Sequence, residues 1–296
     1  MTGRALRGRS PRFLLGALAG VALFLVLWEW AARGQSPAVM PSPARTFEAL
    51  GGLITDGTLL PELGLTVGRA FVATLCAAVV GVLFGWAAAR FDFADGLLAP
   101  LRAVLQGLPP IVLIVCLVLW MGSDPAITVI VCTTVMVPLV AAATTSALRG
   151  VDPHLLELAA GLHLSRTRRT VFVVVPAVLP AILAATGAVA SASLRVVVMA
   201  ELLSAPDGIG AAIAQNRTLL QTPELYAWTL VLVGCALAVD VLVRAVVSRW
   251  SAVFTPSRRA PGGRPARVAG GRPARVAGGR PARAVSSRSR AGTRSR

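Results

Sequence analysis

The sequence predicts an all-α membrane protein with six transmembrane helices, and three observations support this fold class. Of the 296 residues, 55% are hydrophobic. Only 14% are charged, whereas a typical soluble domain carries about 25%. The apolar residues are gathered into runs of about 20 or more, which is the length that an α-helix needs to cross a bilayer, and polar segments separate these runs.

The N-terminal segment predicts the first membrane span. Residues 1–12 contain four arginines and no acidic residue, and residues 13–32 are almost wholly apolar. A cleavable signal peptide is the alternative. However, the run is long enough to span, and it ends at Trp28 and Trp30, which are typical of a membrane interface, rather than at a small-residue cleavage site. We expect a transmembrane helix preceded by a basic cytoplasmic N-terminus and followed by an outer connection over 33–64.

Residues 65–250 form the predicted core of five further transmembrane helices. Their expected spans are 65–89, 98–121, 126–147, 171–200 and 225–247. Pro109 and Pro110 interrupt the second of these runs and free backbone carbonyls that other helices or water must satisfy. Arg69, near the beginning of the first run, is expected to anchor the helix at the membrane interface. The same run contains small residues that would let helices approach closely, namely Thr66, Gly68, Gly81 and Gly85.

The distribution of arginine predicts the orientation in the membrane. The sequence contains no lysine, so all 29 basic residues are arginine, which suggests a G+C-rich bacterial genome. Six spans place both termini on one side. Segments on that side contain Arg4, Arg7, Arg9, Arg12, Arg90, Arg102, Arg149, Arg166, Arg168, Arg169 and Arg249, and segments on the other side contain Arg33, Arg45 and Arg217. Because cytoplasmic loops carry the excess of positive charge, we expect a multi-pass protein of the bacterial inner membrane with both termini in the cytoplasm.

Residues 251–296 are predicted to form a disordered, arginine-rich tail. Three near-identical octads begin at positions 262, 270 and 278, and residues 257–296 contain 12 arginines and no acidic residue. Such a composition cannot form a core. The tail could contact the phosphates of a nucleic acid or the anionic headgroups of membrane lipids. Lipid is the favoured partner and nucleic acid the disfavoured one, because no aromatic residue is interleaved to stack on bases.

The loop over 150–170 is charged, lies between two strongly apolar runs, and predicts a short surface helix. Asp152 and Pro153 are a start signal, with an acidic N-cap followed by proline at the first helical position. An apolar stripe at helical spacing is formed by Leu155, Leu158 (or Ala159) and Leu162, and a basic cluster follows at Arg166, Arg168 and Arg169. A short amphipathic helix between two membrane-length runs indicates a cytoplasmic attachment point for another protein.

This stretch resembles the EAA loop of ABC-importer permeases, the inner-membrane components of binding-protein-dependent transport, and in particular the nitrate/sulfonate/taurine branch. The residues that carry the resemblance are Glu157 and Ala159, with Leu158 in place of the middle alanine of the motif, and Pro176 further on. The family has a glycine six residues after the glutamate, where this chain has His163, and Gly161 lies two positions earlier. Because glycine adopts a positive φ more readily than histidine, either the turn after the helix differs or the helix continues through position 163.

The resemblance covers roughly residues 38–250 and implies the ABC type I importer permease fold, with the short helix as a cytoplasmic coupling helix. In that family the permease lines the translocation pathway, ABC ATPase subunits grip the loop helix, and an extracytoplasmic solute-binding protein delivers the solute. A second permease copy completes the pathway, here expected as a homodimer. The branch implies a small solute such as nitrate, a sulfonate, taurine or a related nutrient. The implied ATPase-coupling residues are Glu157, Leu158, Ala159, Gly161, Leu162, His163, Arg166 and Pro176.

The chain contains no recognisable catalytic motif. A P-loop, GxSxG, HExxH and paired-carboxylate motifs are all missing from the sequence, so we expect a transport subunit whose ATP is hydrolysed by a partner. No cofactor or metal is expected, because the four cysteines lie inside apolar runs without CxxC spacing. A self-contained secondary transporter would favour inverted repeats and more intramembrane charge. A polytopic enzyme acting on lipid would need clustered His, Asp or Glu at one membrane face.

Four ionisable residues near the ends of spans are functional candidates within the membrane. Asp240 and Arg244 are spaced i, i+4 and are predicted to pair on one helix face. Arg195, the deepest of the four, and Glu201 are the candidates for the translocation pathway. The alternative for Arg195 is that its side chain reaches the membrane interface or pairs with another helix.

Overall fold

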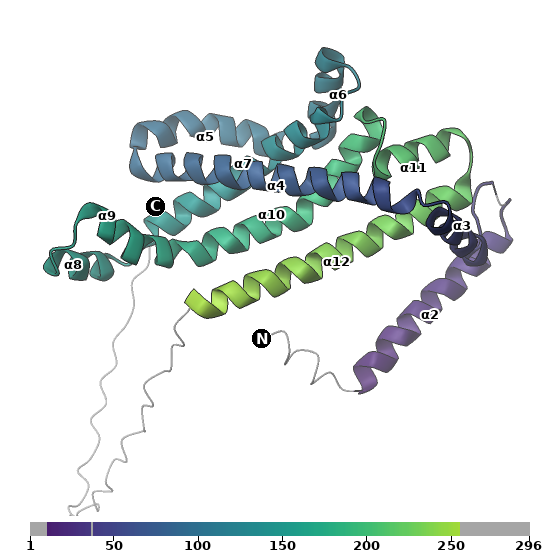
Figure 1. The fold of residues 1–296 in the computed structure, drawn as a ribbon, viewed down its shortest axis with the longest axis horizontal. Helices are drawn as coiled ribbons and strands as arrows, with labels where there is room; N and C mark the ends of the chain where they lie inside the picture. The colour runs from purple at the N-terminus through teal and green to yellow at the C-terminus, as the bar shows by residue number, and fades with distance from the viewer. Residues whose placement is uncertain (1–10, 37, 255–296) are drawn as a thin grey trace, which may run out of the picture. The chain divides into compact units, whose positions relative to one another are not determined.

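The computed structural model describes residues 11–36 and 38–254, and every regular element in these two ranges is helical (Figure 1). The elements are α2 (Pro11–Arg33), α3 (Pro43–Thr55), α4 (Leu59–Arg90), α5 (Asp92–Gly107), α6 (Pro110–Met121), α7 (Ala126–Arg149), α8 (Pro153–Gly161), α9 (Arg166–Arg169), the π-helical turn η1 (Thr170–Val174), α10 (Val175–Ser204), α11 (Ile209–Thr218) and α12 (Thr222–Phe254). Nearly all of the predicted basic N-terminus and of the predicted disordered tail lies outside the described residues.

Five of the helical segments are long and apolar enough to cross a membrane. They cover Leu15–Arg33, Leu59–Arg90, Ala126–Arg149, Arg166–Ser204 and Thr222–Arg249. A sixth span is obtained only if α5 and α6, which are bent by 97° relative to each other, are counted as one broken span. The all-α membrane fold predicted from the apolar runs is therefore confirmed.

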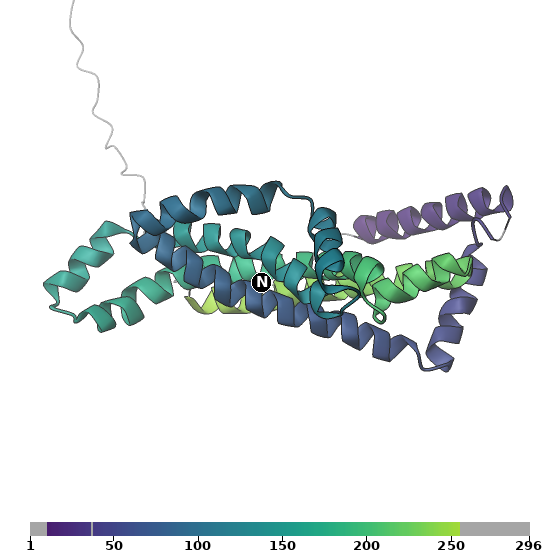
Figure 2. The same cartoon turned by 90° about the horizontal axis from the view of Figure 1, so that it is seen from above.

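The run predicted over 98–121 is not one straight helix. Leu108 and Pro109 both have extended backbone, and Pro110 begins α6. The residue before a proline avoids the α conformation, so two consecutive prolines break the helix at this point, and α6 turns away from α5 (Figures 1 and 2). α5 also begins at Asp92, inside the segment that the sequence predicted as a polar connection.

Small residues set the distance between α4 and α7. A Cβ added to Gly81 would lie 2.6 Å from Val140 Cβ, and one added to Gly85 would lie 2.6 Å from the carbonyl oxygen of Ala141. Both glycines are therefore required for close packing, as their sequence pattern predicted. Gly68, by contrast, has no atom within 4 Å of an added Cβ, and its prediction as a packing residue is wrong.

Polar contacts join three helices at one end of the core. At the end that contains α8 and α9, Arg149 donates to Asp95 Oδ2 over 2.9 Å and to the carbonyl oxygen of Ala88 over 3.0 Å, and Arg102 also pairs with Asp95. These contacts join the ends of α4 and α7 to the beginning of α5. α3 and α11 lie at the opposite end of the bundle (Figures 1 and 2).

The first span is attached to the core by an aromatic contact. Trp28 Nε1 donates to the carbonyl oxygen of Pro41 over 3.1 Å, and the indole stacks on Tyr226 with ring centroids 5.9 Å apart. Trp30, two positions further on, leaves 75% of its surface exposed, and its position at a membrane interface stays a prediction. Most of the remaining apolar surface of α2 is also exposed.

Candidate functional site

The short helix α8 begins where the sequence placed its start signal. Asp152 is the N-cap, and its side chain accepts a hydrogen bond from the backbone N–H of His154 over 2.9 Å. Pro153 occupies the first helical position, where its missing N–H leaves no bond unmade. A capped start stabilises a helix by about 1 kcal/mol, which matters for a helix of nine residues that is too short to be stable alone.

α8 ends in a tight turn centred on His163. The backbone N–H of Leu164 donates to Ala159 O over 3.2 Å, and that of His163 donates to Ala160 O over 2.9 Å. This pair of bonds is the Schellman motif, which requires a left-handed residue just beyond the helix, and His163 has φ +50°. Of the two alternatives that the sequence left open, continuation of the helix is excluded: the chain turns at 163 although histidine replaces the glycine expected there.

His163 permits a direct test of this turn. His163→Gly should leave the stability of the folded permease unchanged or raise it slightly, because glycine adopts positive φ without steric cost. His163→Val should destabilise it by about 1–2 kcal/mol, because a β-branched residue resists the left-handed conformation. Thermal unfolding of the purified variants would measure both effects. Equal stability of the glycine and valine variants would contradict a strained turn at this position.

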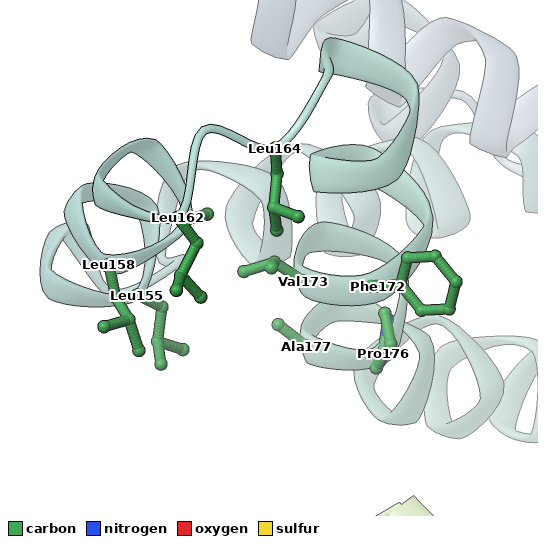
Figure 3. Close-up of a pocket in the computed structure, with 9 residues that line it drawn as sticks. Leu155, Leu158, Leu162, Leu164, Phe172, Val173, Pro176 and Ala177 are labelled. Atoms are coloured by element: carbon green, nitrogen blue, oxygen red, sulfur yellow. The ribbon is translucent and has the colours of Figure 1, made fainter.

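The apolar stripe of α8 is exposed and faces a hollow. Leu155, Leu158 and Leu162 leave 44%, 63% and 65% of their surfaces exposed. Ala159, by contrast, is buried. The hollow has a volume of about 300 Å³, and its remaining lining residues are Ala159, Leu164, Phe172, Val173, Pro176 and Ala177 (Figure 3). A group of exposed leucines beside an open apolar hollow costs free energy in water, and such surfaces mark interaction sites.

Charged residues neighbour this apolar surface along the chain. Glu157 is exposed on α8, with its Oε2 atom 3.6 Å from His154 Nδ1. Arg166 begins α9 after the N-cap Ser165, whose side chain accepts from the N–H of Arg168 over 3.4 Å. Pro176 then enters α10 after η1. Seven of the eight predicted coupling residues thus lie between the start of α8 and the end of α9, and Pro176 lies at the start of α10. Four of the eight line the hollow, namely Leu158, Ala159, Leu162 and Pro176.

A second polar cluster, which we call the Glu201 cluster, is buried near the opposite end of the core. Glu201 on α10 is fully buried and accepts from Thr66 Oγ1 over 2.8 Å, from Arg69 Nη1 over 2.9 Å and from the N–H of Gly210 over 3.1 Å. Arg69 also donates to the carbonyl oxygen of Asp207 over 2.9 Å and pairs with its carboxylate. The Glu201 cluster therefore joins α4, α10 and the turn into α11.

Glycine allows this turn to approach the carboxylate. Gly208 has φ +99°, and an added Cβ would lie 2.5 Å from Glu201 Oε1. An added Cβ at Gly210 would overlap the backbone carbonyl of Val198. Any other residue at position 208 would be strained and would displace the glutamate.

Sequence reasoning missed the role of Arg69. Its prediction as a membrane-interface anchor is wrong, because the side chain is only 11% exposed and its guanidinium is paired with Glu201 and Asp207. The pairing joins residues more than 130 positions apart, so local spacing could not reveal it. The available signal was the presence of one arginine and one glutamate, each at the border of an apolar run.

The predicted Asp240–Arg244 pair on α12 is confirmed, with Asp240 Oδ2 2.5 Å from Arg244 Nη2. Arg195 lies across from it on α10, where its side chain is exposed. Glu201, the other predicted pathway residue, is enclosed in the Glu201 cluster. In the part of the chain that the structure describes, no group of three His, Cys, Asp or Glu could hold a metal ion.

These features define a polytopic, all-helical membrane protein that presents a short capped helix between two of its spans. The chain belongs to the family of binding-protein-dependent transport system inner membrane components, whose model matches residues 77–252. It is therefore the permease subunit of an ABC importer, a multi-pass membrane protein that works with a solute-binding protein and a separate ATPase, which hydrolyses ATP. The two alternatives raised from the sequence, a secondary transporter and an enzyme acting on lipid, are not favoured by this family match.

Individual relatives are similar over most of the chain. The taurine transport system permease protein TauC of Escherichia coli (strain K12) is 25% identical over 83% of this chain and 93% of its own length. The putative aliphatic sulfonates transport permease protein SsuC of Bacillus subtilis (strain 168) is 26% identical over 81% and 89%. The inward-facing structure of the MetNI methionine ABC transporter is 16% identical, with a TM-score of 0.54, over 67% of this chain and 96% of that one. The structural match supports the importer permease fold.

Proposed function

We propose that α8 is the coupling helix of this permease and that ATPase subunits grip it from the cytoplasm. The observation that carries the proposal is the exposed apolar face of α8 beside its hollow. An ATPase side chain that enters the hollow would bury Leu155, Leu158 and Leu162, and each leucine would contribute about 1.5–3 kcal/mol if fully covered. The short helix would then pass the motion of the ATPase to the membrane spans.

The other loop residues support this role in different ways. Glu157 offers a charged contact at the edge of the apolar face. Ala159 packs inward, so its small size holds the helix close to the rest of the loop. Gly161 and His163 end the helix, and Arg166 places positive charge where acidic ATPase groups or lipid headgroups can meet it. Pro176, in the wall of the hollow, leads into α10.

The proposed assembly is a homodimer in the bacterial inner membrane, with both termini in the cytoplasm. The arginine bias supports this orientation, and membrane lipids would cover the exposed apolar surface of α2. A second copy would complete the pathway, to which the described residues of one chain contribute five spans, or six if α5 and α6 form one broken span.

The proposed solute is a small oxyanion of the sulfonate type. Two relatives that align with most of the chain are named for taurine and aliphatic sulfonates. Arg195 is proposed to face this solute. Glu201, fully buried and already bonded to three donors, is proposed to shape the wall of the pathway.

Reporter fusions test the orientation. Fusions after residues 50 and 215 should report the outer side, and fusions after residues 95 and 165 should report the cytoplasm, because the arginine-rich ends are retained inside. Paired reporters that are active on opposite sides, such as alkaline phosphatase and green fluorescent protein, would measure this. An outer location for residue 165 would contradict the proposal, because the ATPase could not reach α8.

A further inference from the structure

A groove that combines apolar walls with several charged side chains is lined by residues of α10 and α12, and it shares no lining residue with the α8 hollow. Its volume is about 660 Å³. The charged and hydroxyl groups along it are Arg195 and Ser191 on α10 and Asp240 and Arg244 on α12, and small residues such as Gly187 and Ala188 form part of its wall. Small side chains leave room beside the charges, so the groove can admit a ligand of several atoms.

The charges in this groove do not balance. Asp240 Oδ2 pairs with Arg244 Nη2 over 2.5 Å, and Asp240 Oδ1 accepts from Ser191 Oγ over 3.0 Å. Both oxygens of the only carboxylate in the groove are thereby engaged. Arg195 has neither an ion pair nor a hydrogen bond from its side chain to any residue that the structure describes. Arg195 still interacts with Asp240 through its charge, but two guanidinium groups that share one carboxylate leave the groove with one net positive charge.

The position of Arg195 makes this charge costly. About 13 Å of helix rise separates it from Ser204, the last residue of α10. A guanidinium at that depth lies within the hydrocarbon layer if Ser204 marks the surface, and an ionisable residue there normally has a partner or lines a watery cavity. Arginine also remains charged under all ordinary conditions. A ligand that neutralises the net charge of the groove must therefore be negatively charged.

We propose that this groove binds one oxyanion group of the sulfonate or phosphate type through the guanidinium of Arg195. The planar guanidinium offers two parallel N–H donors that match two oxygens of such a group, and a ligand with one negative charge would neutralise the groove. The inference deepens the proposed function, on which it rests, by placing the oxyanion on a particular residue. The same chemistry is presented by a transported sulfonate and by the headgroup of an anionic lipid.

Binding of trifluoromethanesulfonate, followed by fluorine NMR, tests the proposal on the full-length permease in nanodiscs of neutral phosphatidylcholine. Saturable binding is expected. Arg195→Gln should weaken it at least about tenfold, because a charge-assisted contact is lost, and Arg195→Lys should restore part of it. Arg217→Gln is the matched control, because Arg217 is also exposed, on α11, but does not line the groove. It should bind as the wild-type chain does.

Nanodiscs of phosphatidylglycerol distinguish the two sources of the oxyanion. If a lipid headgroup occupies the groove, this lipid should displace the sulfonate from the wild-type chain and co-purify with it, but not with Arg195→Gln. In either case the binding must depend on Arg195. Equal binding of both probes by the wild-type chain and by Arg195→Gln would overturn the proposal and would indicate that Arg195 only reaches the membrane interface.

ATPase retention on the same variants separates this inference from the proposed coupling role. If the wild-type chain binds no oxyanion but still retains the ATPase through α8, only the proposed oxyanion site in the groove is refuted. Loss of ATPase retention by α8 variants with groove binding intact would concern only the coupling helix.

Discussion

Glu201→Gln is expected to destabilise the folded permease by about 3–5 kcal/mol, the usual cost of removing one partner from a buried ion pair. Glutamine fills nearly the same volume, so the effect reports charge rather than a cavity. Arg69, which is 11% exposed, would retain Asp207 but lose its most buried partner. The joint between α4, α10 and α11 would loosen, and both thermal stability and the yield of folded protein should fall.

The chain contains a matched control for this prediction. Glu29 and Arg33 form an ion pair of 3.1 Å on α2, but their side chains are 40% and 76% exposed. An exposed pair contributes at most about 1 kcal/mol, so Glu29→Gln should unfold almost as the wild-type chain does. Thermal unfolding followed by size-exclusion chromatography in detergent would compare the two variants. A similar loss of thermal stability in Glu201→Gln and Glu29→Gln would contradict the claim that the buried ion pair of the Glu201 cluster stabilises the fold.

Leu158→Glu is expected to weaken association with the ATPase at least about tenfold. If Leu158 becomes covered in the complex, the variant loses about 1.5–3 kcal/mol of apolar burial and places a charge in the interface. Its side chain is 63% exposed in the permease, so the fold itself should tolerate the change. Co-purification of the ATPase with the tagged permease at equal membrane abundance would measure the effect.

Val39→Glu serves as the control for Leu158→Glu. Val39 is 62% exposed and precedes α3, which lies at the end of the bundle opposite to α8 (Figure 1). Val39→Glu therefore introduces the same charge at a similarly exposed position, away from the proposed docking face. Retention of the ATPase should be unchanged. Equal retention by both variants would show that the exposed face of α8 does not bind the ATPase.

The sequence was sufficient for the fold class and for the start of α8. Apolar runs longer than a bilayer is thick can only be helices or closed barrels, and their length excluded barrel strands. The cap at Asp152 is a local signal carried by two adjacent residues, so it too could be predicted. The apolar stripe of α8 followed from spacing alone.

Other features depend on information that local patterns do not contain. The proline pair at Pro109 and Pro110 predicted an interruption, but the 97° bend depends on how α6 packs against the core. The burial of Arg69 requires a partner on a distant helix. The turn at His163 was undecided because histidine can adopt the left-handed conformation only at a cost, and the surrounding Schellman bonds decide whether that cost is met.

The most direct test of the account is the labelling of a cysteine placed at position 158 by a membrane-impermeant maleimide. The wild-type chain, with its four native cysteines, gives the background. We predict that Leu158→Cys is labelled in inside-out vesicles stripped of the ATPase, is protected when the purified ATPase is added back, and is not labelled from outside in intact spheroplasts. Labelling from the outer side, or labelling that the ATPase does not reduce, would contradict a cytoplasmic coupling helix at α8.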